Sequence, residues 1–221
     1  MGGTAAVNAV PIVGQPVAFG TGFIALVIVG LSRIVGQYFA TLAHEGGHVI
    51  YALVTGRQNI RYNIDDDTAG GATTHDGSYA VLIYLVGYPA GALLGLGGAA
   101  LIAAGNTWAF LVILVIFSAL HLFVAKGGLA LLIPALVIVG VFAAALRGGE
   151  VLQAGLAVGA AWFLLLAATY DAFTLPTDAG DAMNLAIRTV LIPGFIWKLI
   201  WIVVAVVSLY AGGRLLLVPG A

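Results

Sequence analysis

Long apolar segments dominate this chain of 221 residues and decide which folds are open to it. Hydrophobic residues make up 62% of the sequence and charged residues only 8%, whereas soluble domains carry about 25% charged residues. So few charges cannot cover the surface of a water-soluble domain, and so many apolar residues exclude intrinsic disorder. The sequence therefore predicts an all-α polytopic membrane protein that forms one domain over residues 1–221.

Seven apolar segments are candidates for membrane-spanning helices, each of which needs about 20 such residues. They cover residues 17–31, 34–55, 79–104, 108–124, 129–146, 151–168 and 195–210. Only Ser32 and Arg33 separate the first two segments, which together are too long for one upright span. We therefore expect a break near residues 30–36 and a bundle of six to seven transmembrane helices.

The longest polar stretch covers residues 56–78, between the second and third segments. Apolar and polar residues alternate over residues 60–64, three aspartates follow at 65–67, and a glycine pair follows at 70–71. This pattern is typical of a short β-hairpin at a membrane surface. An irregular loop is an equal alternative.

Charge, cysteine content and glycine spacing add three further expectations. The net charge of −1 provides no basic field for nucleic acid, and the absence of cysteine excludes disulfides and thiolate metal sites. Gly87, Gly91 and Gly95 recur at four-residue spacing. Such spacing favours close helix packing in membranes, and we draw only compactness from it.

One motif carries chemistry: His44-Glu45-Gly46-Gly47-His48 has the form H-E-x-x-H. On a helix, residues four apart share a face, so both imidazoles can bind one metal ion. The glutamate then lies beside an open coordination position, where it can accept a proton from water. Two imidazoles and a carboxylate favour Zn²⁺ as the cofactor.

The motif also lies on a polar stripe of an otherwise apolar helix. At 100° per residue, the stripe collects Arg33, Gln37, Thr41, His44, Glu45, His48 and Thr55. Ionisable groups at membrane depth are costly and indicate function. The alternative is a structural stripe whose imidazoles only hydrogen-bond to their neighbours.

A catalytic zinc site needs a third protein ligand. The candidates are His75, His121, Asp171, Asp178 and Asp181, with Asp76 and the aspartates 65–67 less favoured. We expect His121 to be a hydrogen-bonded core or interface histidine and His75 to be exposed. Residues 170–193 look like a break that returns into the protein and begins a helix. Asp178 and Asp181 lie there, although Thr177 or Asp178 could instead be the N-cap, with Asp181 in the first turn.

The chain resembles the site-2 protease class of intramembrane zinc metalloproteases, peptidase family M50, and more narrowly its bacterial M50B-like group. The resemblance rests on residues 41–56 around the H-E-x-x-H motif, on residues 177–185 and on the Gly-Tyr-Pro feature within 86–90. In that class the third ligand follows the pattern Asn-x-x-Pro, four residues, Asp-Gly. Counting from Pro176, the pattern implies Asp181 as the third ligand.

Two residues depart from the pattern of that class. Phe173 replaces the asparagine, which is thought to help hold the substrate strand, and Ala182 replaces the glycine. Asn184 is the residue that could substitute for the missing asparagine. The form Asp181-Ala182-x-x-Leu185 does resemble the M50B-like group.

The resemblance implies peptide-bond hydrolysis in membrane-protein substrates, in a bacterial cell membrane. His44, His48 and Asp181 would bind zinc, and Glu45 would be the catalytic base. We expect the lipid bilayer and a membrane-protein substrate as partners, and no nucleic acid. The alternatives are a transporter or channel that uses the buried stripe, and a catalytically silent membrane adaptor of the same fold.

Overall fold

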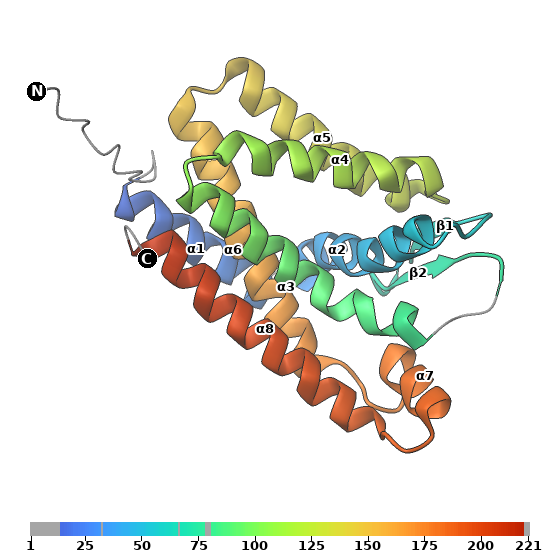
Figure 1. Cartoon of the computed structure of the whole chain (residues 1–221). Helices are drawn as coiled ribbons and strands as arrows, with labels where there is room; N and C mark the ends of the chain where they lie inside the picture. The colour runs from blue at the N-terminus through green and yellow to red at the C-terminus, as the bar shows by residue number, and fades with distance from the viewer. Residues whose placement is uncertain (1–13, 32, 66, 78–80, 219–221) are drawn as a thin grey trace, which may run out of the picture.

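The computed structural model describes residues 14–31, 33–65, 67–77 and 81–218, and it folds them into eight helices and one small sheet (Figure 1). The elements are α1 Gln15–Leu31, α2 Arg33–Val54, β1 Arg61–Ile64, β2 Gly71–Thr74, α3 Val81–Ala103, α4 Thr107–Val124, α5 Gly128–Arg147, α6 Glu150–Thr174, α7 Gly180–Thr189 and α8 Gly194–Leu217. The expected all-α architecture with one hairpin is confirmed.

The helices are long and apolar enough to cross a membrane. Among the described residues, five helices could each form a membrane span alone: α3, α4, α5, α6 and α8. Helices α1 and α2 could form a sixth span together, as a bent pair. The pair bends by 95°, which confirms the expected break between the first two segments. The resulting maximum of six spans agrees with the lower of the two expected counts.

Helix α3 lies at the centre of the bundle and packs against α2, α6 and α8 (Figure 1). Its glycines allow this approach: a Cβ atom built at Gly95 would lie 3.0 Å from Cγ of Leu165, and one at Gly91 would lie 3.4 Å from Cβ of Ala168. Both contacts join α3 to α6, as expected from the spacing of the glycines.

The polar stretch between α2 and α3 forms the expected β-hairpin. β1 and β2 are antiparallel, and Tyr62 lies opposite Thr73 in the register. The Asp65 carboxylate closes the turn: it accepts hydrogen bonds from the backbone and hydroxyl of Thr68 and from the backbone of Asp67. These bonds, led by the Thr68 backbone bond, hold the pKa of Asp65 below its usual value.

The segment between α6 and α8 breaks and begins a short helix, as expected. Helix α6 runs to Thr174, beyond the expected end at residue 168, and α7 starts at Gly180. The N-cap of α7 is Ala179, which makes no side-chain capping bond. The expected alternative of Thr177 or Asp178 as the N-cap is therefore wrong, while Asp181 does lie in the first turn.

Candidate metal centre

The H-E-x-x-H motif lies in the middle of α2, and its two glycines fix how that helix packs. A Cβ atom built at Gly47 would lie 2.5 Å from the carbonyl oxygen of Val86 in α3, and one at Gly46 would lie 2.0 Å from Cζ of Phe117 in α4. Only glycine allows both helices so close. His44 and His48 on the same helix border a cleft that α3 also lines.

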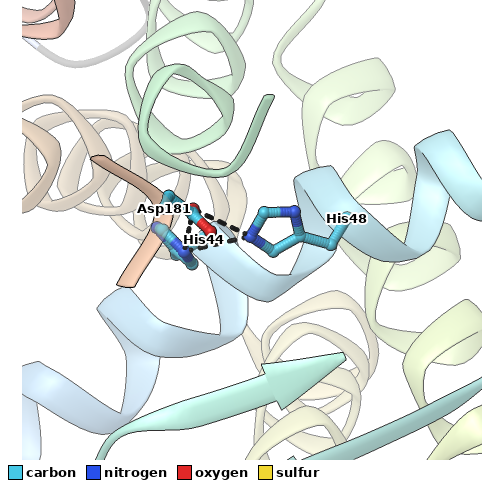
Figure 2. A group of neighbouring side chains, drawn as sticks. All are labelled: His44, His48 and Asp181. Atoms are coloured by element: carbon cyan, nitrogen blue, oxygen red, sulfur yellow. Dashed lines mark hydrogen bonds and ion pairs between the residues drawn. The ribbon is translucent and has the colours of Figure 1, made fainter. Parts of the chain in front are cut away.

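The two imidazoles of α2 and the carboxylate of Asp181 converge on one point (Figure 2). The Nε2 atoms of His44 and His48 lie 3.2 Å apart. Oδ2 of Asp181 lies 3.3 Å from the first nitrogen and 3.2 Å from the second. The three atoms thus form a nearly equilateral triangle between α2 and α7.

This triangle fits a metal ion. Ligands bonded at about 2.0–2.1 Å to a tetrahedral ion stand about 3.4 Å from one another. Oδ2 of Asp181 is buried and has no hydrogen-bond partner, despite its closeness to both imidazoles. A buried carboxylate oxygen without a partner is costly, and a cation at the centre of the triangle would remove that cost.

The backbone around the triangle orients the His48 ring. Nδ1 of His48 lies 2.7 Å from the carbonyl oxygen of Ile83, so this nitrogen carries the proton and Nε2 presents a lone pair to the centre. The His44 ring packs edge-on against Tyr88, with ring centroids 4.5 Å apart. A Cβ atom at Gly87 would lie 2.6 Å from Nε2 of His48, so this glycine leaves room for the rings.

Glu45 lies beside the triangle, under strand β2. Its side chain is buried and accepts a hydrogen bond of 2.7 Å from the hydroxyl of Thr73. A Cβ atom built at Gly71 would lie 2.5 Å from Cγ of Glu45. The hairpin is therefore in direct contact with the glutamate of the motif.

A cleft of about 490 Å³ opens at the triangle. Its walls come from α2, β2, α3, α6 and the start of α7. Five of the seven residues of the predicted stripe line the cleft: Gln37, Thr41, His44, Glu45 and His48. Thr55 follows the end of α2 and is exposed, and the side chain of Arg33 lies outside the described residues.

The structure separates the other ligand candidates from the triangle. Asp171 lines the cleft from α6, but it is not in the triangle. Asp178 is exposed. His121 is a core histidine, as expected: it is fully buried, with Nδ1 2.8 Å from the carbonyl oxygen of Phe117.

The remaining candidates lie at the hairpin. His75 is buried, with Nδ1 3.0 Å from the carbonyl oxygen of Asp76, so the expectation of an exposed side chain is wrong. It follows β2 directly, and its side chain does not extend into solvent. Asp76 accepts a hydrogen bond from Asn59, and Asp67 is exposed. Asp66 lies outside the described residues.

Several residues at the cleft were not found from the sequence. Gly71 and Thr73 contact Glu45 through the hairpin, and Gly87 borders both imidazoles, although its spacing indicated only compactness. The sequence signal at Gly87 was that it is the first residue of the Gly-Tyr-Pro feature. Asn184, in contrast, lies outside the residues that line the cleft, which does not favour it as a substitute for the asparagine of the class.

Comparison with known proteins assigns the chain to a family. The family model described as Peptidase M50B-like matches residues 18–212, which reach from α1 into α8 and include both segments of the triangle. No curated protein and no solved structure matches the chain significantly. The resemblance to the M50 class is thus confirmed. The chain is a membrane protein that belongs to the Peptidase M50B-like family.

Proposed function

We propose that the protein is a zinc metalloprotease that hydrolyses peptide bonds of membrane-protein substrates. The observation that carries the proposal is the convergence of His44, His48 and Asp181 within 3.3 Å of one another, with Glu45 adjacent in the same helix. Two imidazoles and one carboxylate leave a fourth position of a tetrahedral site open, as catalytic zinc requires.

The chemistry divides between the ion and the chain. When bound, zinc supplies the Lewis acidity that makes water nucleophilic at neutral pH. Glu45 accepts the proton of the attacking water and then delivers it to the nitrogen of the leaving amine. The Ile83 carbonyl keeps the His48 ring oriented through both steps.

The hairpin offers a place for the substrate. A transmembrane helix has its backbone groups paired, so it must unwind before cleavage. Residues 70–73 line the cleft beside Glu45. Among the described residues no strand pairs with the outer edge of β2. An extended segment could add to this edge through backbone hydrogen bonds, which would place its carbonyl groups near the triangle.

The test uses the purified full chain in lipid nanodiscs, with zinc measured by elemental analysis. The substrate probe is a single transmembrane helix between two soluble tags, and the cleaved products are counted. Glu45→Gln keeps the shape of the side chain but removes the base. Its matched control is Glu150→Gln, because Glu150 is the other glutamate and lies exposed at the start of α6.

We expect about one zinc per chain in the wild type and in Glu45→Gln, and loss of zinc in His44→Ala. Cleavage should disappear in Glu45→Gln and His44→Ala and persist in Glu150→Gln. Cleavage by Glu45→Gln at the wild-type rate would overturn the proposal. Solute flux through vesicles without any cleavage would favour the transporter alternative instead. The resemblance to the bacterial group leads us to propose a bacterial cell membrane as the location.

A further inference from the structure

The hydroxyl group of Thr73, on strand β2, holds the carboxylate of Glu45 on α2. Oγ1 of Thr73 donates a hydrogen bond of 2.7 Å to Oε2 of Glu45, while the backbone oxygen of Glu45 lies 3.5 Å from the same hydroxyl. A threonine hydroxyl has one proton to donate, and the shorter contact to a charged acceptor takes it. The bond takes one lone pair of Oε2 and holds that oxygen against strand β2, whereas Oε1 makes no bond to Thr73.

The strand that carries Thr73 also confines the rest of the Glu45 side chain. A Cβ atom built at Gly71 would lie 2.8 Å from Oε1 and 2.5 Å from Cγ of Glu45. The backbone of β2 therefore packs directly on the carboxylate of Glu45, a residue that is 4% exposed. Within this narrow space, the bond from Thr73 decides how the carboxylate plane is rotated.

Two further hydrogen bonds fix the hairpin. At the outer edge of β1, the backbone N–H of Lys126 donates a hydrogen bond of 2.6 Å to the carbonyl oxygen of Tyr62. Tyr62 lies opposite Thr73, and residues opposite each other in an antiparallel pair point to the same face. Near the turn, the hydroxyl of Thr41 donates a hydrogen bond of 2.6 Å to the carbonyl oxygen of Ala69. Thr73 is therefore presented to α2 by an anchored strand.

We infer that Thr73 is a positioning residue that orients the Glu45 carboxylate for proton transfer. The inference rests on the proposed function, and it assigns to the hairpin a second role beside substrate binding. Thr73 acts through Glu45 and is not in the triangle of His44, His48 and Asp181. Its loss should therefore lower the turnover number, while substrate binding and zinc binding stay as they are.

The experiment compares three variants of the full chain in nanodiscs. Thr73→Val removes the hydroxyl but keeps the branched shape that favours a strand, and Thr73→Ser keeps the hydroxyl. The matched control is Thr74→Val, because Thr74 is the next residue of β2, is exposed and does not line the cleft. For each variant, kcat and KM are measured with the tagged transmembrane-helix substrate, together with zinc affinity and the apparent Tm.

We expect kcat of Thr73→Val to fall about tenfold to hundredfold, the range for a lost hydrogen bond to a charged group. Its KM should stay within about twofold of the wild type, and its zinc affinity and Tm should not change. Thr73→Ser should recover most of the turnover, and Thr74→Val should match the wild type. This combination distinguishes an oriented base from a general loss of structure.

Three results would overturn the inference. In the first, Thr73→Val turns over like Thr74→Val although Glu45→Gln is inactive, so the proposed function stands and the positioning role fails. In the second, Thr73→Val loses zinc or melts at a lower temperature, and Thr73→Ser does not recover turnover, which shows a structural role. In the third, Glu45→Gln cleaves at the wild-type rate, so the proposed function and the inference fail together.

Discussion

Oδ2 of Asp181 lies 3.2 Å from Nε2 of His48, although the two residues belong to helices far apart in the sequence. The loop before α7 makes this approach possible. Gly180 has a φ of 59°, which favours glycine, and a Cβ atom at Gly194 would lie 2.3 Å from the carbonyl oxygen of Thr177. A tightly packed bend between α6 and α8 thus brings the carboxylate of Asp181 to the two imidazoles.

Replacing each aspartate of this bend in turn should show which of the two is needed for zinc binding. Asp181→Asn removes the charge that faces both imidazoles, so we expect loss of stoichiometric zinc and of cleavage. Asp178→Asn is the matched control, because Asp178 lies three residues earlier and is exposed. Elemental analysis of the two purified variants checks this. Equal zinc content in both would exclude Asp181 as the third ligand.

A methyl group at Gly87 should disturb the imidazoles directly. The added Cβ would lie 2.6 Å from Nε2 of His48 and 2.7 Å from Cε1 of His44. We therefore expect Gly87→Ala to weaken zinc binding by about tenfold or more, the size seen when groups that support metal ligands are altered. Competition with a chromogenic chelator measures the affinity. In the control Gly97→Ala, the methyl group meets open space, and zinc affinity should stay at the wild-type value.

The fold and the first part of the site are predictable from the sequence because both are local. Apolar segments of sufficient length predict the helices. The four-residue spacing of His44 and His48 places both rings on one face of α2. Asp181 could be selected because the family pattern counts residues from Pro176. None of these steps requires knowledge of which helices are neighbours.

The rest of the site depends on contacts between distant segments, which the sequence does not report. The contact of Thr73 with Glu45 arises because the hairpin folds back over α2. The burial of His75 was predicted wrongly, because a polar residue after a turn is usually exposed. The role of Gly87 could not be predicted either, because its spacing indicates close packing but does not identify the two imidazoles that pack against it.

A methyl group at Gly71 should disable Glu45 and spare the metal site. The Cβ atom would lie 2.5 Å from Cγ of Glu45 and 2.6 Å from Cγ2 of Thr41, so both side chains must move. We expect Gly71→Ala to lower kcat at least about tenfold, because a displaced base no longer meets its proton. Zinc content should remain near one per chain. Loss of zinc together with turnover would instead show that the hairpin supports the triangle itself.

The paired glycines of the motif should be needed for stability as well as for the site. At Gly47 a Cβ atom would lie 2.5 Å from the carbonyl oxygen of Val86, and backbone cannot yield as a flexible side chain can. Overpacking of this kind costs about 1–3 kcal/mol, so Gly47→Ala should lower the apparent Tm in nanodiscs. Gly97→Ala should leave Tm unchanged or raise it, because alanine in an open helical position is favoured over glycine by about 0.5–1 kcal/mol. If the Tm of Gly47→Ala equals or exceeds that of the wild type, α2 and α3 pack less closely than they do in this structure.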